Sequence, residues 1–288
     1  MRAYVPDYEL RAPRTINDAL DLIAGEPGAW RVFAGGTDLM VLFEAGVLAH
    51  KNFLSVWHLE ELKGVEVTDE HVTLGALTTY TQVQRHEVLR REFPALCDAA
   101  RETGGWAIQN RGTIGGNIAN ASPAADSPPA LIIYDAELEL ISSKGARWIK
   151  YDEFHTGYKQ TVMRDDELIA RVRLPRQPHG LKSYYRKVGT RRAQAISKVC
   201  MAGAARFGDG GRIESVRLAL GSVAPTVVRC VRTEELLMGQ LIDAGLIKSA
   251  RETLAHEIAP IDDIRSTKDY RLRVAANLLE DFLTSIKA

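Results

Sequence analysis

The chain has 288 residues, enough for about two domains that each bury a hydrophobic core. Its 37 lysines and arginines balance its 37 aspartates and glutamates, so the net charge of zero supplies no long-range attraction for nucleic acid or an anionic membrane. A hydrophobic fraction of 45% and a charged fraction of 26% are typical of a soluble globular protein, and no apolar run reaches the roughly 18 residues that a membrane-spanning helix needs.

The chain begins with a helix pattern followed by a strand pattern. Apolar residues recur with helical spacing from Ile16 to Ile23, and Thr15 lies where an N-cap is expected. Residues 30–34 are rich in strand formers and lead into two glycines, after which the apolar residues 39–42 predict another helix. Strand, glycine turn and helix therefore follow one another.

A second cycle follows the first. Residues 72–74 predict a strand, and Thr79 with Gln82 has the spacing of a capping box ahead of a helix that carries Val83 and Leu89. This alternation indicates a chain of mixed α and β structure with mixed connections.

Residues 104–129 contain five glycines and three prolines, which predicts a long irregular loop of the kind that usually carries function. Strands are expected near residues 137–141 and 168–174. Residues 176–180 have the composition of a linker.

The last third of the chain predicts a β-hairpin followed by helices. The two strands are expected at residues 199–207 and 212–220, with residues 208–211 as the turn. The final helix is expected to begin at Ser266 and to bury an apolar face that ends near Ile286.

Several familiar catalytic motifs are missing from the sequence. There is no GxxxxGK[ST], GxSxG or HExxH pattern, and the seven histidines lack ligand spacing, so no catalytic or metal-ligating residue is predicted. Cys97, Cys200 and Cys230 are too few for an iron–sulfur cluster and too far apart for a CxxC site. Reduced thiols and an N-terminus without a signal-peptide pattern predict a cytoplasmic protein.

Two glycine pairs offer the best candidate binding site. Gly35–Gly36 follows a strand and Gly115–Gly116 lies in the sequence TIGGN, where the lack of a Cβ lets backbone amides approach a phosphate. Two such segments would suit the two phosphates of a dinucleotide, although each pair can also serve as a simple turn. The GxGxxG pattern of a Rossmann fold is absent.

Four segments of the sequence and their spacing form a recognisable pattern. The segments are RVFAGGTDLM from residue 31, GALTTYTQV from residue 75, GGWAIQNRGTIGGNIANASPAADSPPALIIYDAELEL from residue 104 and YRKVGTRRAQAISKV from residue 185. Together they resemble the FAD-binding medium subunit of the molybdenum hydroxylases, the group that contains xanthine dehydrogenase and carbon monoxide dehydrogenase. An aspartate nine residues beyond the asparagine of TIGGN is specific to this pattern.

The resemblance implies an α+β fold. Residues 1–176 would form a FAD-binding domain of two subdomains, similar to the vanillyl-alcohol-oxidase (PCMH) type. Residues 181–288 would form a smaller α+β domain with an antiparallel sheet, of the kind found at the C-terminus of the carbon monoxide dehydrogenase flavoprotein.

The resemblance also implies a set of residues that bind FAD noncovalently, since no residue lies in a motif for covalent flavin attachment. They form two diphosphate segments, a position beside the ribityl chain, and further contacts to the cofactor. Arg186 is an alternative to its neighbour Lys187. The set comprises Val32, Phe33, Ala34, Gly35, Gly36, Thr37, Asp38, Leu39, Ala76, Thr113, Ile114, Gly115, Gly116, Asn117, Ser122, Asp126, Ile169 and Lys187.

By the same resemblance, the chain is an electron-transfer subunit. Electrons would come from an iron–sulfur small subunit and pass to NAD⁺ or another acceptor, while a molybdenum large subunit carries molybdopterin and hydroxylates the substrate. Features such as AGGTDL are closer to the xanthine dehydrogenase type, which implies a purine, another N-heterocycle or an aldehyde as substrate. The substrate, the final acceptor and the stoichiometry stay open.

Two other functions are compatible with parts of the sequence. One is a self-sufficient FAD-dependent alcohol dehydrogenase or oxidase, but 288 residues leave little room for a substrate-capping domain. The other is a scaffold that has lost its cofactor, which the intact AGGTD and TIGGN segments argue against.

Overall fold

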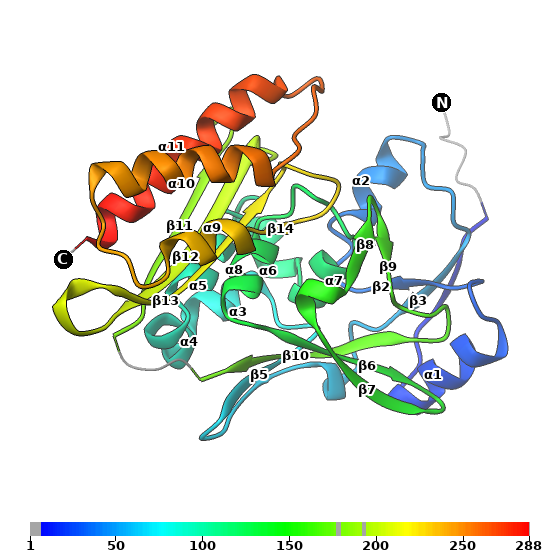
Figure 1. Ribbon diagram of the computed structural model, residues 1–288. Helices are drawn as coiled ribbons and strands as arrows, with labels where there is room; N and C mark the ends of the chain where they lie inside the picture. Colours follow the sequence, from blue (N-terminus) through cyan, green and yellow to red (C-terminus); the bar gives the residue numbers. More distant parts are fainter. Residues whose placement is uncertain (1–6, 177–179, 192–193, 288) are drawn as a thin grey trace.

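The computed structural model describes residues 7–176, 180–191 and 194–287, which form three lobes (Figure 1). We call residues 9–55 the N-terminal lobe, residues 65–175 the middle lobe and residues 182–286 the C-terminal lobe. No helix in these described ranges is long and apolar enough to cross a membrane.

The N-terminal lobe is a small parallel sheet with two helices. Its strands have the order β1-β3-β2, and α1 covers a core that includes Trp30 and Leu54. Thr15 caps α1 by accepting a hydrogen bond from the amide of Asp18, as predicted. The elements are β1 (Glu9–Arg11), α1 (Ile16–Gly25), β2 (Arg31–Phe33), α2 (Leu39–Glu44) and β3 (Asn52–Ser55).

The middle lobe contains a five-stranded antiparallel sheet in the order β4-β5-β10-β6-β7. Alternate residues of β10 enter two different cores: Leu168 and Ala170 pack with the N-terminal lobe, whereas Ile169 and Val172 pack with the helices of the middle lobe. The sheet strands are β4 (Val65–Val67), β5 (His71–Gly75), β6 (Glu137–Ser142), β7 (Gly145–Lys150) and β10 (Leu168–Pro175).

Six short helices and a small hairpin complete the middle lobe. The Thr79–Gln82 capping box begins the first of these helices, as predicted, but the helix ends at Arg85 and a second one carries Leu89. The helices are α3 (Tyr80–Arg85), α4 (Glu87–Glu92), α5 (Pro94–Glu102), α6 (Trp106–Arg111), α7 (Ile114–Ala119) and α8 (Ser127–Ile133), and the hairpin consists of β8 (His155–Gly157) and β9 (Gln160–Thr161).

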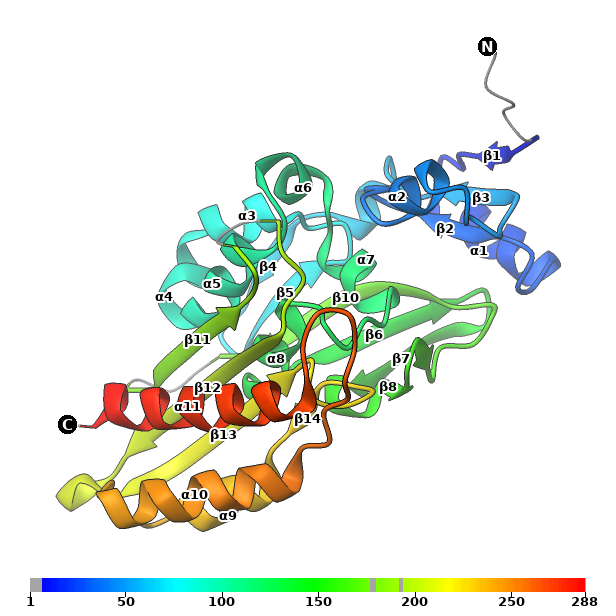
Figure 2. The same ribbon diagram turned by 90° about the horizontal axis from the view of Figure 1, so that it is seen from above.

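The C-terminal lobe is an antiparallel sheet between two layers of helices (Figure 2). Ala202 and Ala204 face α5 and α8 of the middle lobe, while Met201 and Ala205 face α10 and α11. Its elements are β11 (Lys182–Val188), β12 (Val199–Phe207), β13 (Ile213–Gly221), β14 (Val228–Arg229), α9 (Val231–Leu237), α10 (Ala244–Glu257) and α11 (Lys268–Ile286).

Most predicted elements and the α+β class are confirmed, including the hairpin of β12 and β13. The prediction for residues 104–129 was wrong, because α6, α7 and the start of α8 occupy much of that segment. The final helix is capped by Thr267, one residue beyond the predicted Ser266. The predicted linker falls partly on residues 177–179, which lie outside the described residues.

Candidate functional site: a cleft between three lobes

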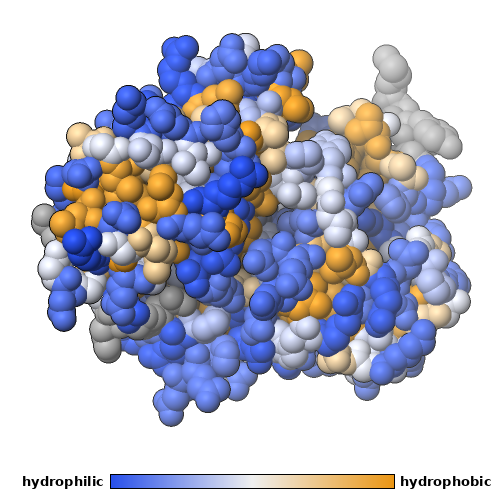
Figure 3. All heavy atoms as spheres, in the orientation of Figure 1, coloured by the Kyte–Doolittle hydropathy of each residue, from blue (hydrophilic) through white to orange (hydrophobic). Residues whose placement is uncertain are grey.

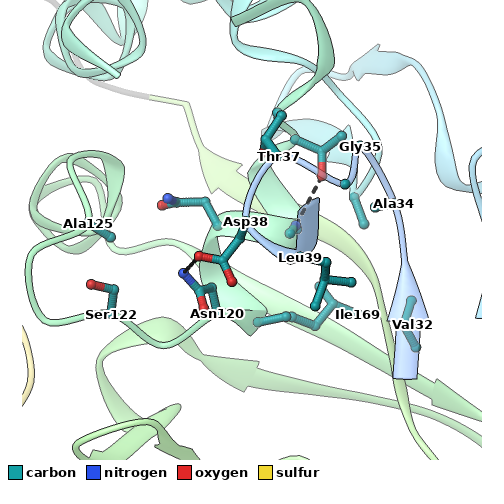
Figure 4. A pocket seen from close by; sticks show the side chains of 18 of the residues that line it. Val32, Ala34, Gly35, Thr37, Asp38, Leu39, Asn120, Ser122, Ala125 and Ile169 are labelled. Atoms are coloured by element: carbon teal, nitrogen blue, oxygen red, sulfur yellow. Dashed lines mark hydrogen bonds between the residues drawn. The ribbon is translucent and has the colours of Figure 1, made fainter. Parts of the chain in front are cut away.

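A cleft of about 950 Å³ is lined by residues of all three lobes. The glycine segment before α2 lies on one side, and the segment that runs from α7 to α8 lies on the other (Figure 4). Ile169 of β10 lies between them, and residues 194–196 of the C-terminal lobe extend the lining. The cleft therefore forms where the connections of separate sheets meet.

The first glycine segment presents free amides to the cleft. Within the described part of the chain, the backbone amides from Gly35 to Leu39 donate no hydrogen bond. Gly36 has a φ of +75°, a conformation that favours glycine. A side chain on Gly35 would overlap the carbonyl oxygen of Arg111, so this segment packs directly against the end of α6. The free amides form a ready site for an anion.

The second glycine segment differs from its predicted form, because TIGGN is the start of α7 and not a loop. The amides of Ile114, Gly115 and Gly116 donate to Thr78 O, Ala76 O and Thr113 Oγ1, at 3.0, 2.8 and 3.1 Å. Its amides are therefore already used inside the protein.

The glycines of α7 matter because they have no side chain, and not because their amides are free. A Cβ on Gly115 would lie 2.6 Å from the Cβ of Ala76, so Gly115 allows α7 to pack against the middle sheet. A Cβ on Gly116 would meet only the hydroxyl of Thr113, at 2.9 Å, and Gly116 lines the cleft. Gly116 thus keeps the cleft open where a side chain would enter it.

A polar bridge crosses the cleft wall. Asn120 Nδ2 donates to Asp38 Oδ1 at 3.2 Å, which Figure 4 shows as a dashed line. Lys159, in the turn between β8 and β9, donates to Asn120 Oδ1 at 2.7 Å. The bridge joins the N-terminal lobe to two segments of the middle lobe.

Asp126 and Lys187 form a buried ion pair at the C-terminal lobe. Lys187 Nζ lies 2.7 Å from Asp126 Oδ2 and also donates to the carbonyl oxygen of Glu102. Burial raises the pKa of Asp126, and the Lys187 ammonium and a hydrogen bond from Ser197 act in the opposite direction. The pair lies between α8 and β11 and links the two lobes.

The structure brings almost the whole predicted set together. All of these residues line the cleft except Phe33, Ile114 and Lys187. Phe33 lies beneath Gly36, and Ile114 is buried in the middle core. Lys187 is joined to the cleft lining through Asp126.

The lining also includes charged residues that the sequence analysis missed. Arg31, Lys159, Arg164 and Glu167 come from strand ends and turns, and no motif marks them. Glu167 is fully buried and accepts two hydrogen bonds from Arg147, at 2.7 and 2.9 Å. Burial opposes ionisation of Glu167, but the hydrogen bonds from Arg147 and the Arg164 amide outweigh it and lower the pKa.

Comparison with known proteins places this chain in a family. Residues 6–177 match the family described as "FAD binding domain in molybdopterin dehydrogenase", and residues 183–286 match the "CO dehydrogenase flavoprotein C-terminal domain". The chain therefore belongs to the FAD-binding medium subunits of the xanthine dehydrogenase and carbon monoxide dehydrogenase family. It is an oxidoreductase flavoprotein subunit and its cofactor is FAD. The predicted family is confirmed.

Two curated relatives match over most of their length. The xanthine dehydrogenase FAD-binding subunit of Escherichia coli O157:H7 is 31% identical, over 95% of this chain and 94% of the relative. The glyceraldehyde dehydrogenase medium chain of Sulfolobus acidocaldarius is 30% identical, over 94% of this chain and 95% of the relative.

Solved structures share the fold. Carbon monoxide dehydrogenase from Hydrogenophaga pseudoflava superimposes with a TM-score of 0.93 at 24% identity, covering 99% of this chain and 100% of the other. Quinoline 2-oxidoreductase from Pseudomonas putida 86 gives a TM-score of 0.91 at 24% identity, with 98% of each chain covered. The α+β fold with a separate C-terminal sheet is therefore common to these proteins.

Proposed function

We propose that FAD binds noncovalently in the cleft between the three lobes and that the chain transfers electrons within a molybdenum hydroxylase complex. The observation that carries this proposal is the row of free amides from Gly35 to Leu39, in a cleft that Gly116 keeps open. Free backbone amides suit the negative charge of a diphosphate, because they donate hydrogen bonds without a competing partner.

The other predicted residues would contribute shape and polar contacts. Ala76, Ile169 and Val32 give the cleft apolar walls, while Asn117 and Ser122 place polar side chains on its edge. Asn117 Oδ1 accepts a hydrogen bond from the buried hydroxyl of Ser127 at 2.7 Å. The amide nitrogen of Asn117 then stays available for the cofactor. The residues predicted from the resemblance stay our proposed binding set.

The proposed electron path divides the chemistry between subunits. Held in the cleft by the segments around Gly35 and Gly116, FAD would supply the redox chemistry that couples one-electron carriers such as iron–sulfur clusters to a two-electron acceptor such as NAD⁺. This chain's residues hold the cofactor and limit its contact with water. Its three cysteines, all buried free thiols, are too few to hold a cluster. The iron–sulfur clusters and molybdopterin would therefore be carried by a small and a large partner subunit.

We further propose that the complex is of the xanthine dehydrogenase type, is cytoplasmic, and hydroxylates a purine, another N-heterocycle or an aldehyde. The 31% identity to a xanthine dehydrogenase FAD-binding subunit supports the type of complex. Copurification with the natural partner subunits, followed by assays of FAD, molybdenum, iron and NAD⁺ reduction, tests this part of the proposal. A monomer that oxidises an alcohol without metals would contradict it.

Acid precipitation tests the mode of FAD attachment. Because no covalent link is proposed, acid should release FAD into the supernatant and leave a colourless pellet. Chromatography of the supernatant distinguishes FAD from FMN. A yellow pellet, or FMN in the supernatant, would contradict noncovalent FAD.

A further inference from the structure

One wall of the cleft is held in place by the C-terminal lobe. This wall, residues 122–126, connects α7 to α8 and lines the cleft at Ser122 and from Ala124 to Asp126. The amide of Ser222 donates to Pro123 O at 2.8 Å, and the hydroxyl of Tyr185 donates to Asp126 O at 3.0 Å. Backbone atoms of the wall are therefore fixed by β11 and by the residue that follows β13.

The side chain of Asp126 is held at both oxygens. Oδ2 pairs with Lys187, and Oδ1 accepts a hydrogen bond from Ser197 Oγ at 2.6 Å. Ser197 is 1% exposed and Asp126 is 7% exposed, so this hydrogen bond is shielded from bulk water. A hydrogen bond to one oxygen fixes the rotation of the carboxylate and directs the other oxygen at the ammonium.

Ser197 is itself anchored by a buried polar chain. Ser222 Oγ donates to Ser197 O at 3.0 Å, and Arg271 Nη1 of α11 donates to Ser222 O at 2.7 Å. Arg271 Nη2 then donates to Asp263 Oδ1 at 2.7 Å. Ser222 has a φ of +65°, outside the usual range for serine, and these bonds hold it there.

These hydrogen bonds form one continuous network between α11 and the cleft wall. It starts at Asp263 beside α11, passes through Arg271 and Ser222, and ends at Ser197 and Asp126 on the cleft wall. Ser197 also directly follows residues 194–196, which line the cleft. Apart from Arg271 Nε, which has no partner among the described residues, the buried side-chain polar atoms of this network are hydrogen-bonded. Hydrogen bonds of such a buried polar network rigidify the groups that they connect.

We propose that Ser197 is a positioning residue of the cofactor site, which orients Asp126 toward Lys187, and that Ser222 and Arg271 of the C-terminal lobe hold Ser197 in place. This inference rests on the proposed binding of FAD in the cleft. It makes the C-terminal lobe a working part of the cofactor site, because a residue outside the FAD-binding domain sets the geometry of one inside it.

Titration of the full-length apoprotein with FAD, followed by quenching of flavin fluorescence, tests the proposal. Ser197→Ala should weaken FAD binding about tenfold, because the Asp126 carboxylate loses the bond that orients it. Ser222→Ala should weaken binding in the same direction. Ser142→Ala is the matched control: this serine is also buried, but it lies at the end of β6 and not in the cleft lining, so the Kd should stay unchanged.

A double-mutant cycle separates positioning from general destabilisation. If Ser197 acts through Asp126, Ser197→Ala should add less than about a twofold loss in an Asp126→Ala background. The visible absorption band of bound FAD should shift in the same way in the Ser197→Ala and Asp126→Ala single variants. If Asp126→Ala does not fold, as judged by circular dichroism, Lys187→Met provides the second background.

The outcomes distinguish the inference from the function on which it rests. A wild-type chain that fails to bind FAD would contradict the proposed function itself. Normal FAD affinity in Ser197→Ala, or losses that add fully in the double variant, would overturn only the positioning role. Normal affinity in Ser222→Ala would overturn the anchoring of Ser197 by Ser222 and Arg271.

Discussion

At the scale of single residues, two glycines of the cleft lining, Gly35 and Gly116, have different roles. Gly35 has backbone of another segment directly against it, so it permits close packing of the N-terminal lobe on the end of α6. Gly116 faces the cleft and has only the hydroxyl of Thr113 near its missing side chain. Substitution of the first should therefore affect stability, and substitution of the second should affect FAD binding.

We predict that Gly116→Val weakens FAD binding roughly ten- to hundredfold, since overpacking of this kind costs about 1–3 kcal/mol. The valine side chain would occupy cleft volume, and the fold should survive. Fluorescence titration with FAD measures the effect, and circular dichroism checks the fold. Gly25→Val is the matched control, because Gly25 is also helical and a Cβ there meets nothing within 4 Å. Full flavin occupancy in Gly116→Val would show that this glycine lies outside the FAD site.

We predict that Gly35→Ala lowers the stability of the apoprotein. The new methyl group would overlap the Arg111 carbonyl oxygen, so backbone has to move at a cost of about 1–3 kcal/mol or more. Urea unfolding of the apoprotein should show a lower midpoint than in wild type and in a Gly25→Ala control. An unchanged midpoint would mean that the segment of Gly35 can move away from the end of α6 without loss of stability.

At the scale of elements, threonine caps position the segments around the cleft. Thr79 caps α3 and also pairs with Thr113, which caps α7. Both caps accept a hydrogen bond from an amide three residues ahead. The start of α7 is therefore fixed relative to α3, and Gly116 is fixed with it.

The capping box of α3 gives a prediction at this scale. Thr79→Ala should lower the free energy of unfolding by about 1 kcal/mol, because the first turn loses its side-chain acceptor. Chemical denaturation measures the loss. Thr79→Ser retains the hydroxyl and should recover most of the stability; equal losses in both variants would assign the effect to packing.

The ion pair between Arg147 of β7 and Glu167, just before β10, predicts that the stability of the fold depends on pH. Glu167 has a pKa below its ordinary value of 4.5 in the folded protein, so its ionised form stabilises the fold. Glu167→Gln should cost about 1–3 kcal/mol at neutral pH. That difference from wild type should persist down to about pH 4.5 and narrow below it, as the carboxylate takes up a proton. Thermal unfolding between about pH 3 and pH 7 measures this, and a difference independent of pH would contradict it.

At the scale of the whole molecule, some apolar side chains stay exposed, among them Val41 at the edge of the cleft. α2 has no buried residue although five of its six residues are apolar, and Met40 and Val41 are more than half exposed. Figure 3 shows apolar residues gathered in patches on an otherwise hydrophilic surface. A neutral chain relies on shape and apolar contact, more than on charge steering, when it associates.

The proposed complex gives the corresponding prediction. Wild type purified with its natural iron–sulfur and molybdenum subunits should reduce NAD⁺ with the substrate of the complex. A complex that contains Gly116→Val should still reduce an artificial dye at the metal centres, but its NAD⁺ reduction should fall in proportion to the FAD that it has lost. Loss of both activities would indicate failed assembly instead.

The sequence alone determined the elements whose signals are local. Periodic apolar residues, threonine caps and the glycine turn between β12 and β13 act over a few residues, so they predicted α1, α3 and the hairpin. The resemblance of AGGTDL and TIGGN to known segments then brought most of the cleft lining together. The density of glycine and proline in residues 104–129 was misleading, because packing on α3, on the middle sheet and on the C-terminal sheet stabilises α6, α7 and α8 there.

Tertiary structure alone decided how the candidate site works. The sequence does not show that the amides of α7 are used internally while those before α2 are free, since the acceptors Ala76 O and Thr78 O belong to a distant segment. Nor does it show that Ser197 and Arg271 connect the C-terminal lobe to Asp126. Hydrogen-bond partners far apart in the chain are set by how the sheets pack, because local propensity carries no information about which segments meet.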